Sequence, residues 1–332
     1  MQVNIIENIN NLPQFEPQNV FQTADYMRLF ENENDTKVVL FAIYSNSASK
    51  LVETTQPQQF IDNNPTLLLL QPITIHHFLK FLPRKFGSYA IAWREPWRNP
   101  TITDTEAQQA FKALQKAINQ YCRHKALYIE YRHFSENNIY TPTFNSQPSI
   151  HNFPWYNIYQ QFNAGESIER SMNKSKRKQL HQSLKAGATI ELNPNNNEIK
   201  EWYDLLKKLY KRIHRPLPSL QLFLNLNQSN IGKLFIVKYN NKVISGTALL
   251  YHPKSQHYYD WYRASTNEQI DGIYPSVVST WQAMQLVADM GGGTFDFLGA
   301  GPRNKPYGVR DFKLTFGGKL TPEHRYRKYL LW

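Results

Sequence analysis

The chain has 332 residues, of which 41% are hydrophobic and 14% aromatic, with a single cysteine and a formal net charge of +12. One cysteine excludes a disulfide framework and a multi-cysteine structural zinc site, and the aromatic content excludes an intrinsically disordered chain. Because domains have roughly 100–200 residues, this length predicts two domains or one large one.

The excess positive charge lies in the second half of the chain. Residues 1–150 contain 13 basic and 13 acidic side chains, whereas residues 151–332 contain 25 basic and 13 acidic ones. This asymmetry indicates a polyanionic partner for the second half, such as nucleic acid, an anionic membrane surface or a phosphorylated substrate. The alternative is that lysine-rich helix faces are simply solvated.

The first ten residues and the longest apolar run bear on the location of the protein. Residues 1–10 have neither the basic region nor the apolar region of a signal peptide. The longest apolar run, residues 67–70, is far too short to span a bilayer. We therefore expect a cytoplasmic protein.

The first half alternates segments of strand and helix character. Runs rich in branched and aromatic residues predict strands at residues 38–44, 66–70, 88–93 and 126–132. Apolar residues at helical spacing predict a helix over residues 105–125. This is an α/β (α+β) pattern. Cys122 falls late in that helix, and we expect it to have a packing role.

The composition changes to Asn, Ser, Pro and Thr over residues 135–154, which predicts the connection between two domains, 1–150 and 151–332. Two basic helices follow, over residues 167–186 and 198–214. Gly187 is a natural cap for the end of the first, and Pro216 stops the second.

A block of strands comes next. It consists of strands at residues 233–239, 243–251 and 256–264, a helix over residues 276–290 opened by Pro275, and a strand at residues 294–298. Asn240-Asn241 predicts a tight hairpin turn, and Gly291-Gly292-Gly293 is expected to form the turn that ends the helix. This order of elements resembles the GNAT acyltransferase topology.

Three motifs strengthen that resemblance: RIHRPLPS at residues 212–219, YDWYRAS at residues 259–265, and FDFLGAG at residues 295–301 followed by YGVRDFKLTFGG at residues 307–318. Together they are similar to the FemAB/FemX group of non-ribosomal peptidyl transferases, over residues 160–330. The resemblance implies two tandem GNAT-like domains, each a mixed twisted sheet flanked by helices. It also implies an enzyme that moves an aminoacyl or acyl group onto a primary amine of a cell-envelope precursor or surface glycan.

The resemblance implies roles for individual residues of the site. The family's Phe-Lys pair matches Phe312 and Lys313, and this lysine would stabilise the oxyanion that forms when an amine attacks the donor ester. The alternative is a solvated strand lysine. Asp296 matches an acidic residue at a strand end, where it could deprotonate the attacking ammonium or orient a neighbour. It could equally pair with Arg310 or cap a turn.

The remaining candidates are substrate-binding residues. Tyr262 matches an aromatic strand that lines the acceptor site, and Arg215 lies where the family has an arginine near its substrate's phosphate. Both could instead have structural roles. Arg310, Tyr307 and Gly299 complete the set because they belong to the matched motif.

The donor is left open between aminoacyl-tRNA, acyl-CoA and an acyl carrier protein. Residues 269–274 occupy the place of the loop that holds the CoA pyrophosphate in GNAT enzymes, but Pro275 removes a backbone donor there and one glycine remains. This argues against a simple acetyl-CoA enzyme. No Walker A or zinc motif is present, so we expect no metal and no tightly bound cofactor, and we assign no cofactor-binding residue.

Partners and alternatives follow from these features. The basic helices at residues 167–215 would bind tRNA or the diphosphate of an activated acceptor, with peripheral contact to an anionic membrane at its inner face. We expect a monomer. One alternative is a CoA- or carrier-protein-dependent GNAT N-acyltransferase, with a CoA site in the N-terminal domain. The other is a non-catalytic polyanion-binding protein on a GNAT scaffold.

Overall fold

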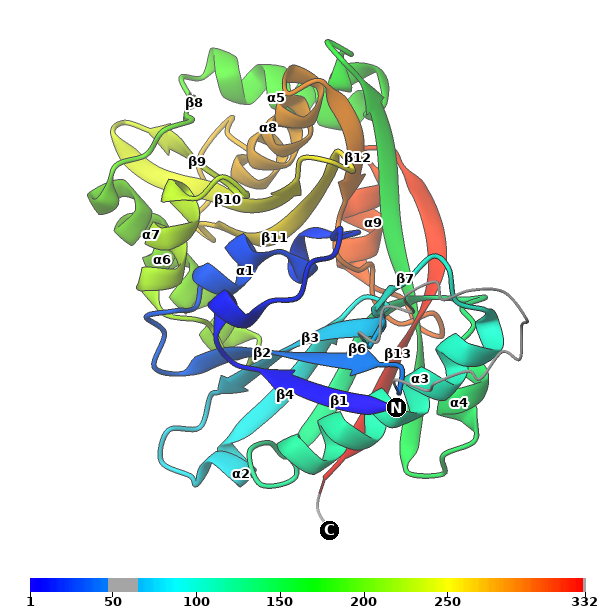
Figure 1. The fold of residues 1–332 in the computed structure, drawn as a ribbon. Coiled ribbons are helices and arrows are strands. Elements are labelled where there is room, and N and C mark those ends of the chain that lie inside the picture. The colour runs from blue at the N-terminus through cyan, green and yellow to red at the C-terminus, as the bar shows by residue number, and fades with distance from the viewer. Residues whose placement is uncertain (47–64, 331–332) are drawn as a thin grey trace, which may run out of the picture. The chain divides into compact units, whose positions relative to one another are not determined.

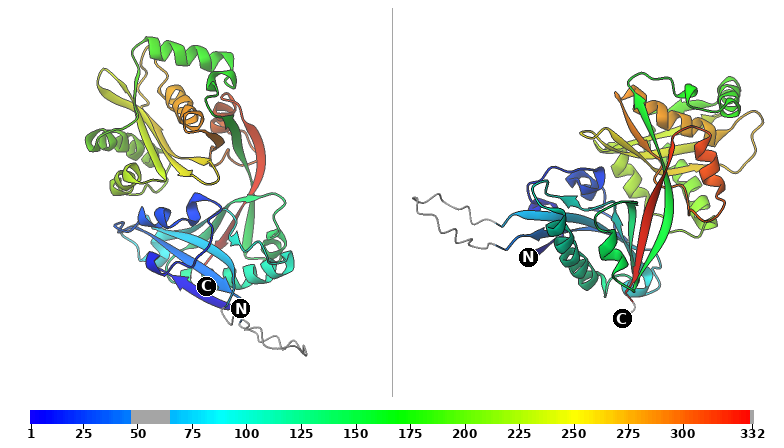
Figure 2. Two further views of the ribbon diagram at one scale, coloured as in Figure 1. Left: turned by 45° about the horizontal axis from the view of Figure 1, so that its top comes forward. Right: turned by 90° about the vertical axis from the view of Figure 1, so that its right-hand side faces the viewer.

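The computed structural model describes residues 1–46 and 65–330. It divides into two compact units (Figures 1 and 2). Unit 1 comprises Met1–Glu16, Val38–Asn152 and Tyr326–Trp332, and unit 2 comprises Pro17–Lys37 and Phe153–Arg325. The units differ from the predicted continuous halves, because an early segment belongs to unit 2 and the last residues belong to unit 1.

Unit 1 has a mixed sheet in which β1, β2, β3, β4 and β6 lie in that order. The pairs β1–β2 and β3–β4 are antiparallel, and β4–β6 is parallel. Its elements are β1 (Gln2–Ile6), β2 (Thr36–Tyr44), β3 (Leu67–His77), α2 (Arg84–Gly87), β4 (Ser88–Trp93), β5 (Trp97–Arg98), α3 (Asp104–Cys122), β6 (Tyr128–Ser135) and α4 (Thr141–Asn145).

The core of unit 1 forms where α3 packs on the sheet. Thr103 and Glu106 form a capping box at the start of α3, which satisfies backbone N–H groups there. Apolar residues three and four positions apart, such as Phe111, Leu114 and Ile118, are fully buried against the strands. Cys122 is also fully buried, and burial raises the pKa of its thiol to about 12. The expected packing role of Cys122 is therefore confirmed.

In unit 2 the strands β7, β12, β11, β10, β9 and β8 lie in that order, with parallel and antiparallel pairs. The strand β7 (Ile150–Asn163) enters the unit from unit 1, and β13 (Lys319–Tyr329) leaves it. The other elements are α1 (Ala24–Arg28), α5 (Lys174–Lys185), β8 (Thr189–Glu191), α6 (Asn196–Arg212), α7 (Leu220–Gln228), β9 (Gly232–Tyr239), β10 (Lys242–His252), β11 (His257–Ser265), α8 (Pro275–Asp289), β12 (Gly292–Asp296) and α9 (Gly308–Leu314).

Helices cover both faces of the unit 2 sheet. In Figure 1, α8 lies on one side of β9, β10 and β11, and α6 and α7 lie on the other. The predicted hairpin is present: Asn240 and Asn241 have φ of 48° and 60°, the left-handed values that a two-residue turn between β9 and β10 requires. The structure thus has the predicted α/β class in both units.

Several elements differ from the sequence prediction. The helix expected over residues 167–186 is a short turn followed by α5, which begins at Lys174 because the Asn173 side chain caps it. Gly292 and Gly293 start β12 instead of ending α8. The stretch at residues 135–154 contains α4 and the start of β7, and Phe144 of α4 lies in the unit 1 core. The helices α7 and α9 and the strand β13 were not predicted.

Candidate active site

Two parallel strands of unit 2 pair side by side and end at different points. The pairing of β11 with β12 runs from His257↔Thr294 to Tyr259↔Asp296, where β12 ends, and β11 continues to Ser265. The parallel pair β4–β6 of unit 1 likewise ends where β4 ends, at Trp93↔Arg132. In unit 2, β11 therefore extends beyond the turn that follows β12.

The turn after β12 is held by Asp296. This carboxylate is 0% exposed, and its Oδ1 accepts a hydrogen bond of 2.7 Å from the backbone N–H of Leu298. His257 Nε2 lies 3.4 Å from Asp296 Oδ2. Leu298 and Gly299 have φ of 49° and 112°, so the chain turns sharply after the strand. Asp296 thus caps a turn, one of the roles expected for it, and its burial favours positioning over proton transfer.

Asn157 of β7 fixes the same turn from the next strand. Its Nδ2 donates to Asp296 Oδ1 at 2.8 Å and to Glu323 Oε1 at 3.3 Å. Its Oδ1 accepts from the backbone N–H of Ile158 at 2.8 Å and of Gly299 at 2.7 Å. All four hydrogen-bonding positions of this fully buried amide are filled, so the turn has a defined geometry.

Lys313 reaches this turn from α9. Its ammonium donates hydrogen bonds to the carbonyl oxygens of Phe297 at 2.8 Å and Gly299 at 2.7 Å. An ammonium has three N–H donors, so these two bonds leave one for a substrate. Lys313 is a helix residue that is half-buried, which excludes the alternative of a solvated strand lysine.

The charges around Lys313 tune its proton affinity. Burial lowers the pKa of Lys313 from 10.5 to about 8. The carboxylates of Asp260 and Asp296 raise that pKa, whereas the guanidinium groups of Arg263 and Arg325 lower it. A lysine with a lowered pKa, held by two carbonyl oxygens of the turn after β12, is a candidate for a reactive centre.

The rest of the Fem-type motif surrounds Lys313. Gly299 supplies one of its two carbonyl partners. Arg310 donates to the carbonyl oxygens of Pro302 and Lys305, both at 2.9 Å, so it organises the loop before α9. The Tyr307 ring packs on Gly301, where a Cβ would lie 2.3 Å from that ring. Phe312 lies beneath Lys176 of α5, whose ammonium is 5.2 Å from the ring centroid.

Tyr262 and Arg215 lie elsewhere in unit 2. The Tyr262 ring contacts Tyr210 of α6 and Phe223 of α7, with centroid distances of 5.8 and 5.1 Å. Arg215 is exposed after the end of α6, and no described residue bonds to its side chain. None of these contacts places Tyr262 or Arg215 at the turn that holds Lys313.

Sequence reasoning missed Asn157, His257 and the ion pair between Asp260 and Arg263. Asp260 and Arg263 stand in the YDWYRAS motif, so their position in it was a usable signal. Asn157 had none, because it follows a stretch rich in Asn, Ser and Pro and only the folded turn gives it partners.

The start of α8 is blocked by α5. The backbone N–H of Tyr274 donates to the Ser183 hydroxyl of α5 at 2.9 Å, and Pro275, the first residue of α8, has no N–H. Gln182 of α5 lies close enough that a Cβ on Gly272 would be 3.4 Å from its amide nitrogen.

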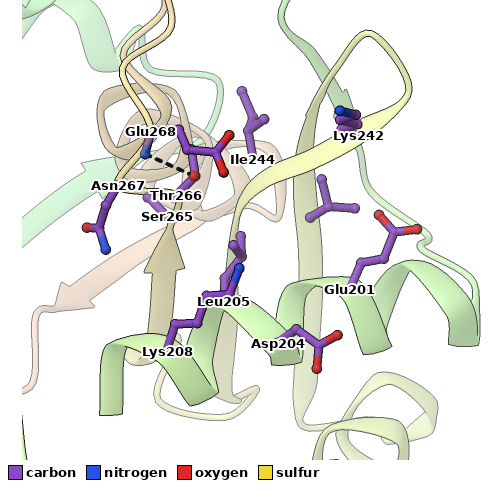
Figure 3. Close-up of a pocket in the computed structure, with 11 residues that line it drawn as sticks. Glu201, Asp204, Leu205, Lys208, Lys242, Ile244, Ser265, Thr266, Asn267 and Glu268 are labelled. Carbon is purple, nitrogen blue, oxygen red and sulfur yellow. Dashed lines mark hydrogen bonds between the residues drawn. The ribbon is translucent and has the colours of Figure 1, made fainter. Parts of the chain in front are cut away.

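A cavity of about 360 Å³ lies at the far end of β11. Figure 3 shows it between α6, the start of β10 and the chain that follows β11. Its walls carry the carboxylates of Glu201, Asp204 and Glu268 and the ammonium groups of Lys208 and Lys242. Within residues 1–46 and 65–330, no cluster of His, Cys, Asp or Glu is arranged to hold a metal ion, and no helix is long and apolar enough to cross a membrane.

Comparisons with known proteins define the fold. No protein-family model matches the chain, and no curated protein matches its sequence. Among solved structures, FemX has 14% sequence identity and a TM-score of 0.61, with 94% of this chain and 92% of that chain covered. A tandem GNAT protein from the clavulanic acid biosynthesis pathway has 7% identity, a TM-score of 0.57 and 99% of each chain covered. L-PGS from Bacillus licheniformis has 10% identity and a TM-score of 0.53, covering 78% and 81%.

The chain therefore has a tandem GNAT-type fold of the FemX kind. The predicted resemblance to the FemAB/FemX group is confirmed at the level of the fold.

Proposed function

We propose that this chain is an N-acyltransferase that moves an aminoacyl group from aminoacyl-tRNA onto a primary amine of a cell-envelope precursor or surface glycan. The observation that carries this proposal is the ammonium of Lys313, fixed by two backbone carbonyls in the turn that follows β12. A fixed cation with a remaining N–H is suited to acyl transfer, because that reaction develops negative charge on one oxygen.

The chemistry assigned to Lys313 is electrostatic. A neutral amine attacks the carbonyl carbon of the donor ester, a C–N bond forms, and the carbonyl oxygen becomes an oxyanion. The remaining N–H of Lys313 stabilises that oxyanion. The C–O bond to the carrier then breaks, and the proton lost by the amine ends on the departing oxygen. Asp296 and Asn157 keep the carbonyl partners of Lys313 in place.

The start of α8 supports a donor other than CoA in unit 2. A GNAT enzyme holds the CoA pyrophosphate with free backbone N–H groups at this helix N-terminus. Here the Tyr274 N–H is bonded to Ser183, and α5 lies across the loop.

The start of α3 supports a donor other than CoA in unit 1 as well. The first turn of α3 carries Asp104 and Glu106, and Glu106 closes a capping box with Thr103. Two carboxylates at a helix N-terminus repel a pyrophosphate. A CoA site in the N-terminal unit, one of the alternatives from the sequence, is therefore disfavoured.

The basic helix α5 supports a polyanionic donor. Its N-terminus is anchored beside α9, because the Asn173 N–H donates to the Thr315 carbonyl oxygen at 2.9 Å. Lys174, Lys178 and Lys185 of α5 are exposed to solvent. A phosphate backbone bound along α5 would bring its acylated end toward Phe312 and Lys313.

The test compares donors directly. The protein is incubated at low salt with charged total tRNA or with acetyl-CoA, in an extract of envelope precursors, and the products are identified by mass spectrometry. Aminoacyl addition from tRNA that is lost in Lys313→Met supports the proposal. Transfer from acetyl-CoA alone would assign the CoA-dependent alternative instead. Binding of tRNA without transfer, unaffected by Lys313→Met, would assign the non-catalytic polyanion-binding alternative.

A further inference from the structure

A buried ion pair lies directly beyond the end of the pairing between β11 and β12. Tyr259 is the last residue of β11 that pairs with β12, and Asp260 is the next residue along the strand. Asp260 Oδ1 lies 3.1 Å from Arg263 Nη2, and the two side chains are 6% and 17% exposed. Asp260 is thus the first residue of β11 beyond the part of the strand that pairs with β12.

A β-bulge sets the direction of this pair. In a regular strand, residues 260 and 263 would point to opposite faces. Here Ala248 pairs with Tyr262 and Leu249 with Asp260, so the register shifts and Trp261 has no partner on β10. The bulge turns Asp260 and Arg263 to the same side. Arg263 also donates to Thr280 of α8, which identifies that side as the one covered by α8.

The opposite face of the bulge is filled by aromatic residues. Trp261 contacts Tyr26 and Phe30 of the segment that includes α1, with centroid distances of 6.2 and 6.4 Å. These contacts anchor the backbone at Trp261, the residue after Asp260. The direction of the carboxylate is therefore set by packing.

The ion pair lacks hydrogen-bond geometry. Asp260 Oδ1 and Arg263 Nη2 are 3.1 Å apart, but neither atom, nor Nε of Arg263, forms a hydrogen bond with any described residue. Burying charged atoms without hydrogen bonds is costly, so a polar partner would stabilise this pair. Tyr259 pairs with Asp296, and Lys313 binds the carbonyl oxygen of Phe297, so Asp260 and the ammonium of Lys313 both lie just beyond the same strand pair.

We infer that Asp260 is a subsite for a primary ammonium group of the substrate, placed beside the carbonyl that Lys313 polarises. This inference rests on the proposed function and deepens it. The α-ammonium of an aminoacyl donor is one carbon away from the reacting carbonyl, which matches a carboxylate beside Lys313. The ammonium of the acceptor has the same chemistry and would meet the same carboxylate before it loses its proton.

Binding of matched ligand pairs tests the inference without turnover. The donor pair is 3′-glycylamino-3′-deoxyadenosine and its glycoloyl counterpart, in which a hydroxyl replaces the ammonium. The acceptor pair is a lysyl peptide and the same peptide with 6-hydroxynorleucine. Affinities are measured by calorimetry for the wild type and for Asp260→Asn. We expect one ammonium ligand to bind the wild type about tenfold or more tightly than its hydroxyl counterpart, and Asp260→Asn to abolish that difference.

The pair that shows this difference identifies the source of the ammonium. Equal binding within both pairs, a difference that persists in Asp260→Asn, or no binding of any of the four ligands would overturn the inference. The proposed function is decided separately, by transfer from charged tRNA and its loss in Lys313→Met.

Two further variants show whether a loss of the preference for ammonium ligands comes only from a loss of folding. Asp260→Asn leaves Arg263 buried without a counter-ion, so the double variant Asp260→Asn/Arg263→Gln, which removes both charges, is measured alongside. It should also lose the preference for the ammonium ligand. Asp289→Asn, an exposed carboxylate at the end of α8, is the matched control and should retain the wild-type preference.

Discussion

The carbonyl oxygen of Gly299 accepts a hydrogen bond of 2.7 Å from Lys313, while the N–H of the same glycine donates to Asn157 at the same distance. One peptide segment thus connects a buried amide on β7 to an ammonium on α9. Because Asn157 also bonds Asp296, the position of Lys313 depends on three elements that are far apart in the sequence.

Asn157→Ala should therefore reduce both stability and turnover. The substitution leaves the Gly299 N–H and one Asp296 bond unpaired in the core, which should cost about 2–4 kcal/mol of unfolding free energy. We expect kcat to fall more than KM rises, since Lys313 loses its fixed partner. Chemical denaturation and steady-state kinetics measure the two effects. Asn197→Ala, at an exposed position of α6, is the control, and a folded Asn157→Ala protein with normal kcat would contradict this role of Asn157.

Activity should decline as pH rises through the pKa of Lys313, about 8. The protonated amine is the form that stabilises an oxyanion, so the active form is lost above that pH. Lys313→Arg retains a cation whose pKa exceeds 12, so this decline should disappear from its profile. Lys313→Met should lower kcat by about 10²–10³-fold at all pH values. A wild-type rate that stays constant from pH 7 to 10 would argue against a protonated Lys313.

The free energy of unfolding should rise with pH as Lys313 titrates, whereas activity declines. The pKa of Lys313 falls from 10.5 in the unfolded chain to about 8 in the folded protein. Between these values the unfolded state binds more protons, so the free energy of unfolding rises with pH. Below pH 8 the full cost of burying the ammonium remains. Relative to Lys313→Met, which supplies the baseline, the free energy of unfolding of the wild type should rise by about 1–3 kcal/mol between pH 8 and 10.5. Urea denaturation measures both proteins. A constant difference across this range would exclude the pKa shift.

Charge reversal on α5 tests the polyanion surface. Lys174→Glu and Lys178→Glu together should weaken tRNA binding and flatten its dependence on salt, by about 0.7–0.9 in the log–log slope for each phosphate that is no longer neutralised. The matched control is Lys112→Glu with Lys116→Glu, two exposed lysines of α3. Filter binding at several salt concentrations measures both proteins. Equal weakening in the two would show that only net charge matters.

Much of the fold was predictable because its main helices and strands have clear periodicity. The stripe of α3 and the Asn240-Asn241 turn are local signals, and both are present in the structure. The strand β13 was missed because its sequence KLTPEHRYRKY is mostly polar, and partners such as Glu130 for Arg327 are supplied only by folding. The helix α9 has seven residues, too few for a periodic pattern.

The site was predictable only where a motif carried it. Lys313, Phe312, Gly299 and Asp296 stand in matched motifs, and the structure brings Lys313, Gly299 and Asp296 together around one turn. Asn157 and the direction of Asp260 depend on a neighbouring strand and on a bulge, and neither leaves a periodic trace in the sequence. Arg310 was expected to bind substrate, but it bonds the carbonyl oxygens of its own loop.

Each unit is built from segments that are separated in the sequence, and this limits how the protein can be divided into fragments. Phe21 and Tyr26, which stack on Tyr259 and Trp261, come from a stretch encoded before most of unit 1. A fragment cut after residue 150 would leave these rings on the wrong piece and strip the support behind the bulge. The protein is therefore not a pair of modules joined by a linker. A gene fusion or recombination event that replaced either half at that boundary would produce two incomplete cores.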